Sequence, residues 1–271
     1  MSTMERFKEK GNLVTFQKEM FGNRRILMQL KKYCKFEQMN EKTRDELQYK
    51  NLFLTQNRYG YRSTEDSLIL LYVLTKKLGF DFSGKAFEFG TGSGIISLLL
   101  ATKIPQIKIT AIEVQESLFN LAKENFLHGG IQERIVLIKM DGREIANRLK
   151  SGMFDCAFSN PPFFKKGEGK RSPSEERQKA RHEELCTMKD ILASFTYLLK
   201  NGGRGFLIYP LTRLDEFVKR TQQSTHILLK EIFFYAHLKK YIGTWKASQK
   251  ETDLYKWKKD SKLFVAEMIK K

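Results

Sequence analysis

Asn160, Pro161, Pro162 and Phe163 stand together in a pattern that suits the handling of a conjugated amino group. Each proline fixes φ and lacks an N–H donor, so the turn is stiff and exposes carbonyl oxygens, and Asn160 adds a side-chain acceptor. Two acceptors that hold the N–H bonds of an –NH2 group can direct its lone pair at an electrophile. No strong base is needed to deprotonate the amino group first, because its N–H protons become acidic only after the nitrogen has attacked the electrophile. Phe163 can stack on a planar target. We therefore predict that these four residues are catalytic; a plain Pro-Pro turn is the alternative.

A glycine-rich turn upstream has the composition of a cofactor-binding loop. Glu88 is followed by Gly90, Thr91, Gly92 and Gly94, and an apolar helix begins directly afterwards. Glycines let the backbone turn tightly and approach a ligand closely, and a helix N-terminus offers free N–H groups. The spacing G-x-G-x-G differs from the G-x-G-x-x-G of dinucleotide-binding folds. We predict that these five residues bind a cofactor; a simple turn between strand and helix is the alternative.

Two further acids follow apolar segments of the kind that form strands. Glu113 follows residues 107–112 and can accept hydrogen bonds from two ribose hydroxyls, because a carboxylate presents two oxygens. Asp141 follows residues 135–138 and either contacts a bound cofactor or caps the next helix. We expect Glu113, Asp141 and Asn160 to line the cofactor site.

Short apolar segments alternate with helical ones from about residue 85 onward. Expected strands cover residues 86–89, 107–112, 135–138, 154–159 and 205–209, and expected helices cover 94–103, 116–127 and a segment ending near residue 200. This alternation predicts an α/β fold with a mostly parallel sheet and helices on both faces. Residues 225–235 and 262–268 would add two final antiparallel edge strands, for seven in all. Residues 1–50 are predicted to be a basic N-terminal helical extension, and residues 51–271 the main domain.

The bulk composition favours a polyanionic partner. The chain has 271 residues and a formal net charge of +18, and 41% of its residues are hydrophobic. With no apolar stretch long enough to span a bilayer and no signal peptide, we expect a cytoplasmic protein that binds nucleic acid. General basicity that only aids solubility is the alternative. The three cysteines show no metal-ligand spacing, so reduced thiols and no metal are expected.

A basic segment follows Phe164. It contains seven basic and three acidic side chains between residues 164 and 183, and we predict that it holds phosphates beside an extruded nucleotide; a solvated surface loop is the alternative. The expected RNA-binding residues are Phe164, Lys165, Lys166, Lys170, Arg171 and Arg181. His182 is expected to be structural.

With these residues in place, the chain resembles the S-adenosylmethionine (SAM) dependent amino-methyltransferases that carry an NPP[FY] motif. More narrowly, it resembles the bacterial tRNA1(Val) adenine-37 N6-methyltransferase family across residues 51–210, including the segment 60–68 ahead of the glycine loop. The resemblance implies a Rossmann-like class I methyltransferase fold, SAM as cofactor and an RNA substrate, with tRNA favoured, for a monomeric enzyme. Glu88 and Phe163 replace the family's usual Asp and Tyr, and residues 211–271 match poorly.

Other functions would use the same acceptor-rich turn. A ribosomal-RNA guanine-N2 methyltransferase is one alternative. A glutamine-N5 methyltransferase acting on release factors is another, since a glutamine amide is also a conjugated –NH2 group; the basic charge argues against it. A non-enzymatic RNA-binding module is the fourth hypothesis and would tolerate loss of Asn160.

Overall fold

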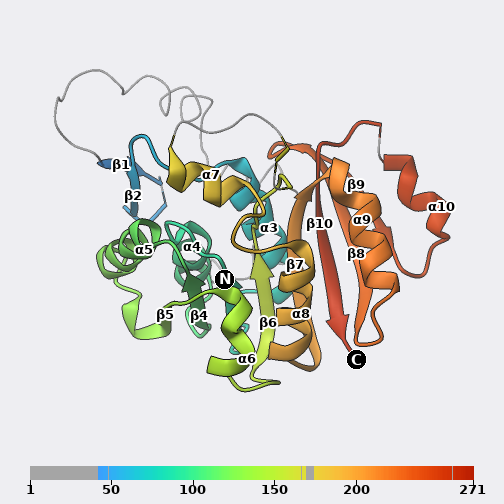
Figure 1. Cartoon of the computed structure of the whole chain (residues 1–271), viewed down its shortest axis with the longest axis horizontal. Coiled ribbons are helices and arrows are strands. Elements are labelled where there is room, and N and C mark those ends of the chain that lie inside the picture. Colours follow the sequence, from blue (N-terminus) through green and yellow to red (C-terminus); the bar gives the residue numbers. More distant parts are fainter. Residues whose placement is uncertain (1–41, 48, 166, 169–173, 258) are drawn as a thin grey trace, which may run out of the picture.

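A computed structural model describes residues 42–47, 49–165, 167–168, 174–257 and 259–271 (Figure 1). The strands are β1 Lys42–Glu46, β2 Phe53–Asn57, β3 Lys85–Phe89, β4 Lys108–Glu113, β5 Ile135–Lys139, β6 Phe154–Ser159, β7 Leu199–Pro210, β8 Ile227–His237, β9 Lys240–Lys246 and β10 Leu263–Lys270. The helices are α3 Glu65–Leu78, α4 Ile95–Lys103, α5 Glu116–His128, α6 Ile145–Arg148, α7 Glu175–Arg181, α8 Met188–Leu198, α9 Leu214–Gln222 and α10 Glu251–Leu254.

The main sheet has the strand order β5-β4-β3-β6-β7-β10-β8-β9 within the described residues. Strands β3 to β7 are parallel to one another, as the alternation of strands and helices predicts. Each parallel strand therefore ends at the same edge of the sheet, where open α/β folds bind ligands. This confirms the α/β prediction and places the polar residues that follow these strands side by side.

The far side of the sheet differs from the sequence-based expectation. The predicted final strands exist as β8 and β10, but β10 lies between β7 and β8 and pairs antiparallel with both, so neither is an edge strand. The edge is an unpredicted eighth strand, β9, which pairs antiparallel with β8. Residues 240–246 alternate polar and apolar side chains only weakly, and a two-residue turn after β8 is enough to pair them with it.

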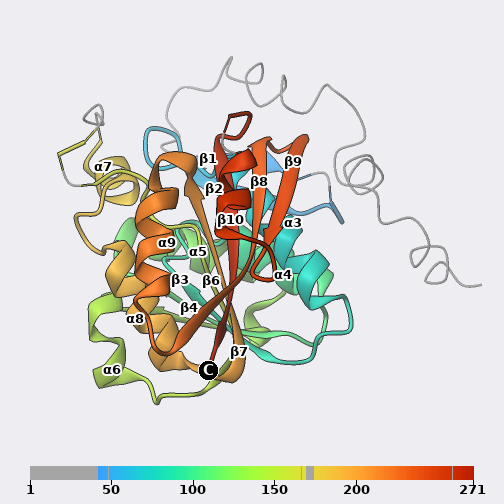
Figure 2. The ribbon, with the colours of Figure 1, turned by 90° about the vertical axis from the view of Figure 1, so that its right-hand side faces the viewer.

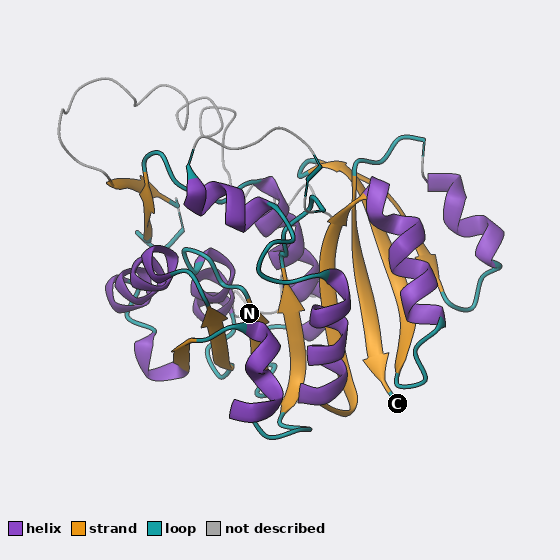
Figure 3. Ribbon diagram, in the orientation of Figure 1, coloured by secondary structure: helices purple, strands orange, loops and turns teal. Residues whose placement is uncertain are grey.

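Helices cover both faces of the sheet and form two cores (Figures 2 and 3). Helices α3, α4 and α5 bury side chains such as Leu70 and Leu98 on one face. Helices α8 and α9 bury Phe195 and Phe217 on the other. Both cores hold the strands rigidly, so the loops at the carboxyl edge start from fixed positions.

The N-terminal region is not wholly helical. Residues 1–41 lie outside the described part of the chain, but Lys42–Glu46 form strand β1, which pairs antiparallel with β2. The predicted boundary at residue 50 therefore falls inside a hairpin. The amide of Asn125 in α5 accepts from the N–H of Thr55 at 2.7 Å and donates to the carbonyls of Thr55 and Ser93. These bonds tie the hairpin to the glycine-rich loop.

A buried carboxylate helps to hold β10 in the sheet. Glu267 has no exposed surface; its Oε1 accepts from Arg204 Nε of β7 at 2.9 Å, and its Oε2 lies 3.2 Å from Lys77 Nζ at the end of α3. Both cations are only partly exposed. One side chain thus joins two strands and a helix.

We predict that Glu267→Ala lowers the free energy of unfolding by about 2–3 kcal/mol, because it leaves the partly buried Arg204 without its counter-charge and removes one of the two acids that pair with Lys77. Glu124→Ala, which removes the partner of the exposed Lys42, is the matched control and should cost less than about 1 kcal/mol. Urea unfolding of both variants measures this, and equal losses would contradict the assignment.

Candidate active site

The glycine-rich loop links β3 to α4 at the carboxyl edge of the sheet. Gly90, Gly92 and Gly94 have φ values of +68°, +59° and +86°, which favour glycine. A Cβ at Gly94 would also stand 2.6 Å from the ring of Phe126. The N–H of Thr91 donates to the carbonyl of Ile112 at 2.9 Å, so the loop is fastened to the neighbouring strand.

Glu88 lies beneath this loop, not in the cavity beside it. Its Oε2 accepts from the hydroxyl of Thr91 at 2.5 Å and from the hydroxyl of Ser97. Burial raises its pKa to about 7, while the two hydroxyl hydrogen bonds oppose that rise. Glu88, Thr91 and Gly94, all predicted to contact the cofactor, are absent from the cavity lining described below. They shape the loop from behind.

Glu113 ends β4 and faces the loop from the side. Its Oε2 accepts from the N–H of Gly92 at 2.8 Å, and its Oε1 accepts from the N–H groups of Val114 and Gln115. Burial raises its pKa, and these backbone hydrogen bonds oppose the rise. A carboxylate has about four acceptor positions, so one remains for a ligand hydroxyl after these three bonds.

Asp141 follows β5 and fulfils the capping alternative. It accepts from the N–H of Arg143 at 2.9 Å at the start of the short helix Gly142–Glu144, and it pairs with the Arg143 side chain. The hydrogen bond from that side chain lowers its pKa. Asp141 also lines the cavity, so its cap does not remove it from a ligand.

These elements enclose a cavity with an empty volume of about 620 Å³. Gly90, Gly92, Glu113 and Asp141 supply its polar wall, and Asn160 closes one end. Its apolar lining is made by Phe89, Ile112, Leu118 and Met140. An elongated ligand with hydroxyl groups and a flat apolar ring fits such a lining, because a few polar groups orient it and the apolar walls hold the ring. The residues present therefore suit a nucleoside cofactor.

The Asn-Pro-Pro-Phe turn starts where β6 ends. Ser159 is fully buried and donates from Oγ to the carbonyl of Phe89 at 2.7 Å, which fastens the end of β6 to β3. Asn160 Nδ2 donates to Ser67 Oγ at 3.0 Å. Phe163 packs against the ring of Tyr209 with a centroid distance of 6.3 Å, and its carbonyl accepts from Arg213. The turn is held on both sides.

A second cavity, with an empty volume of about 1100 Å³, opens on the other side of this turn. It shares Tyr61, Asn160, Pro161 and Ala180 with the first cavity. Its remaining lining is aromatic and basic and is formed by Arg58, Tyr59, Gly60, Arg62, Thr64, Asp66, Phe163, Phe164, Arg177 and Arg181. Asn160 and Pro161 therefore stand where the two cavities meet.

Helix α7, labelled in Figure 1, contributes lining residues to both cavities. Glu176 accepts from the N–H of Tyr61 at 2.8 Å and from Asn57 Nδ2 at 2.7 Å, and so fastens the helix to the segment after β2. A Cβ at Gly60 would stand 2.0 Å from Glu176 Oε1. Glycine at this position allows the carboxylate to approach.

His182 has the structural role expected from the sequence. It is 2% exposed, its Nδ1 lies 3.1 Å from the carbonyl of Gln178, and its Nε2 lies 2.9 Å from the carbonyl of Glu168. Its ring stacks on Phe164 at 5.4 Å. The histidine thus joins the two ends of the basic segment.

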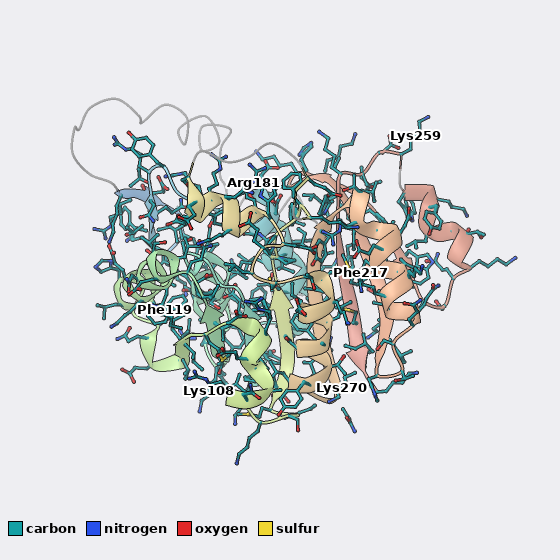
Figure 4. The ribbon with its side chains drawn as sticks, in the orientation of Figure 1. Lys108, Phe119, Arg181, Phe217, Lys259 and Lys270 are labelled. Carbon is teal, nitrogen blue, oxygen red and sulfur yellow. The ribbon has the colours of Figure 1, made fainter. Side chains whose placement is uncertain are left out.

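Only some of the predicted RNA-binding residues line the second cavity. Arg181, which is labelled in Figure 4, lies over the ring of Phe164 at 5.2 Å. Both residues line the second cavity. Lys165 instead pairs with Glu216 at 3.1 Å and is absent from both linings. Lys166, Lys170 and Arg171 lie outside the described residues.

Sequence reasoning missed Tyr61, Ser67 and Glu176 as site residues. Tyr61 and Ser67 fall in the segment 60–68 that was singled out only by resemblance, and nothing in its residue types indicated their partners. Glu176 was counted as one charge of the basic segment. A hydrogen bond between residues 115 positions apart, such as that of Glu176 with Tyr61, has no local sequence signal.

The family model for the methyltransferase small domain matches residues 63–204, or 142 of the 271 residues. The chain belongs to this family. The matched range contains the glycine-rich loop, Glu113, Asp141 and the Asn-Pro-Pro-Phe turn, and the methyl donor of this methyltransferase is SAM. Among the described residues there is no helix long and apolar enough to cross a membrane, and no group of three or more His, Cys, Asp or Glu side chains that could hold a metal ion.

Similar proteins support this assignment. A tRNA1(Val) (adenine(37)-N6)-methyltransferase of Porphyromonas gingivalis is 33% identical over 131 residues, which is 48% of this chain and 51% of that protein. One of Bacteroides thetaiotaomicron is 31% identical over 144 residues, or 53% of this chain and 58% of that protein. The chain spans about half the length of the curated relatives it matches.

Solved structures share the fold. A methyltransferase from Pyrococcus furiosus superposes with a TM-score of 0.52 at 22% identity, covering 81% of this chain and 88% of that one. Pyrococcus horikoshii TYW2 in complex with MeSAdo superposes with a TM-score of 0.54 at 12% identity, covering 86% of this chain and 72% of that one. The fold is therefore that of class I SAM-dependent methyltransferases, with the additional strand β9.

Glu88 should make stability depend on pH. Its folded pKa of about 7 lies above the ordinary 4.5, so its contribution to stability is present below pH 4.5 and is lost as the pH rises through 7. Glu88→Gln keeps an acceptor oxygen but does not titrate. We measure stability as the free energy of unfolding of Glu88→Gln minus that of the native chain. When the pH is raised from 5 to 8, we expect this difference to shift by about 2 kcal/mol in favour of the variant. Urea unfolding of both proteins at both pH values measures this shift. A stability difference that is the same at pH 5 and pH 8 would refute the raised pKa of Glu88.

Glu176 should control retention of the cofactor. Glu176→Gln replaces one acceptor oxygen by an NH2 group, so Tyr61 N–H and Asn57 Nδ2 cannot both be satisfied and α7 is held less firmly. We expect the Kd for SAM, measured by calorimetry, to rise about tenfold. Glu144→Gln, which alters only the exposed pair with Arg148 and no residue of either cavity lining, is the control and should leave the Kd unchanged. Equal affinities in both variants would exclude the role of Glu176.

Proposed function

We propose that the chain is a SAM-dependent N6-adenine methyltransferase that acts on RNA, with tRNA and its adenine 37 as the preferred target. The observation that carries the proposal is the meeting of the cofactor cavity and an aromatic, basic cavity at Asn160 and Pro161. An amino group held there by acceptor oxygens would face the methyl donor directly.

SAM supplies an electrophilic methyl group. The chain's own residues position the amine: Asn160 lines both cavities, its Oδ1 has no hydrogen-bond partner among the described residues, and Pro161 and Pro162 offer no N–H that could compete for it. Tyr61 also lines both cavities, and burial raises its pKa to about 12, so its phenol stays neutral. Catalysis here is positioning with preset acceptors.

The lining of the second cavity favours a nucleic acid over a peptide. Phe163 and Phe164 can stack on a base, and Tyr59, with 76% of its surface exposed, can stack on a neighbouring base. Arg177 and Arg181 can hold phosphates on one rim. Arg58 Nε is buried and has no hydrogen-bond partner within the described residues, so an anionic oxygen would satisfy it.

The start of β9 and the turn before it supply a second group of basic side chains near the cavity. The N–H of Leu238, in the turn between β8 and β9, donates to Glu65 Oε2 at 3.4 Å, beside the cavity residues Thr64 and Asp66. Lys239, in this turn, and Lys240, at the start of β9, are exposed. RNA entering the cavity would therefore meet positive charge from these lysines as well as from the arginines.

The presence of Asp66 in the lining of the second cavity supports a guanine-N2 methyltransferase as the second candidate function. An ionised Asp66 in the target cavity could accept from the N1–H of guanine, whereas N1 of adenine is itself an acceptor. Burial raises the pKa of Asp66, which favours the neutral carboxyl group that can donate to adenine. Adenine is also the base in the names of the relatives.

We further propose that the protein acts as a monomer in the cytoplasm, where tRNA is found. The catalytic domain would begin at β1, with the preceding residues as an extension. These assignments follow from the proposed substrate and from the hairpin that joins β1 to β2.

Methyl transfer from labelled SAM to three separate substrates tests the proposed function. Unmodified tRNA should accept the label, whereas ribosomal RNA and release factor should not, and Asn160→Ala should bind SAM but lose at least 99% of the transfer. Labelling of release factor alone would replace RNA by protein as the substrate. Full activity of Asn160→Ala would contradict the mechanism.

The second group of basic side chains is tested by charge reversal. Lys239→Glu with Lys240→Glu should weaken tRNA binding about tenfold or more and reduce the salt dependence, the slope of log K against log salt, by about two. Lys108→Glu with Lys150→Glu alters the opposite edge of the sheet and is the matched control (Figure 4). Filter binding across a salt series measures both, and identical slopes would remove this group from the interface.

A further inference from the structure

Ser67 contacts the amide of Asn160 from a different part of the chain. It lies in the first turn of α3, is 4% exposed, and accepts a hydrogen bond from Asn160 Nδ2 at 3.0 Å. Ser67 is absent from the linings of both cavities. It therefore touches the proposed catalytic side chain from behind.

A carboxamide has two ends with opposite hydrogen-bonding character. Its oxygen only accepts and its nitrogen only donates, so rotation by half a turn about the last bond would present N–H groups to a target amine. That orientation would repel the amine's own N–H bonds. An asparagine that must accept from an amine therefore needs a partner that keeps its nitrogen turned away.

Ser67 is well placed to be that partner. Its N–H donates to the carbonyl of Thr64 at 3.2 Å, and Ile69 and Leu70 in the same helix are fully buried. The backbone of Ser67 is thus fixed by the core on which α3 packs, and its hydroxyl, which can donate as well as accept, here accepts from Asn160 Nδ2. Side chains that orient a reacting group are effective when their own position is locked in this way.

We propose that Ser67 is a positioning residue that sets the orientation of the Asn160 carboxamide, so that Oδ1 faces the amino group to be methylated. The proposal rests on the proposed function, in which Asn160 accepts a hydrogen bond from that group. Ser67 acts through Asn160 and does not touch the substrate.

Substitution of both partners separates this role from a purely structural one. A carboxylate at position 160 has two equivalent oxygens, so its acceptor character does not depend on which way it is turned. If Ser67 sets the orientation of the carboxamide, its loss should slow methyl transfer strongly when residue 160 is asparagine and only slightly when residue 160 is aspartate. If Ser67 only stabilises the helix, its loss should cost the same in both backgrounds.

The experiment measures single-turnover methyl transfer to unmodified tRNA at saturating SAM in the full chain, with Ser67→Ala, Asn160→Asp and the double variant. We expect Ser67→Ala to slow methyl transfer about 10- to 100-fold and to change the Kd for SAM less than twofold. The double variant should transfer methyl less than about twofold more slowly than Asn160→Asp alone. Ser194→Ala is the matched control, because Ser194 is a buried helical serine that bonds within its own helix. It should transfer at the native rate.

A second readout does not depend on turnover. In the native chain the side-chain NH2 of Asn160, assigned by its loss in Asn160→Asp, should give two sharp, slowly exchanging NMR signals, and in Ser67→Ala these should broaden or exchange at least tenfold faster. Unchanged signals, or Ser67→Ala transfer within twofold of native while Asn160→Ala is inactive, would overturn the proposal. If the native chain methylates no RNA, or Asn160→Ala is fully active, the proposed function fails instead.

Discussion

A loop that offers its amides and space to a ligand can make few backbone hydrogen bonds of its own, and the whole site depends on how this constraint is met. Three acids add to the backbone bonds that remain, such as that of Thr91 with Ile112. Glu88 holds the glycine-rich loop from below through the hydroxyls of Thr91 and Ser97, and Glu113 holds it from the side through the N–H of Gly92. The half-buried Glu176 holds helix α7 by accepting from the N–H of Tyr61. These carboxylates help to shape the cofactor cavity.

The same arrangement separates two electrostatic environments in one strongly basic chain. Beneath the cofactor loop, acids lie in buried positions where their pKa values rise. Around the second cavity, arginines and aromatic rings prevail. The Asn-Pro-Pro-Phe turn lies at the boundary and is itself uncharged, which suits the transfer of a methyl group to a neutral amine. Its orientation comes from Ser67 on α3, outside both cavities.

Much of the sheet and the glycine-rich loop could be predicted from the sequence, because strand periodicity and glycine spacing are local signals. The order of the last strands could not be predicted: β10 inserts between β7 and β8 through pairings across the sheet, and β9 has a weak pattern of its own. The same reason explains why Glu88 was expected in the cofactor cavity. Its position next to the glycines is visible in the sequence, whereas its direction depends on Thr91 and Ser97.

The central claim is that this site methylates an exocyclic amino nitrogen. The most direct measurement is tandem mass spectrometry of nucleosides from tRNA treated with the native chain and SAM carrying a deuterated methyl group. The account predicts that the label is found on N6 of adenosine, at a single position of the tRNA. A label on a ring atom, such as N1 or C2, or on a ribose oxygen would contradict it, because an acceptor-lined turn cannot direct those atoms at the methyl group.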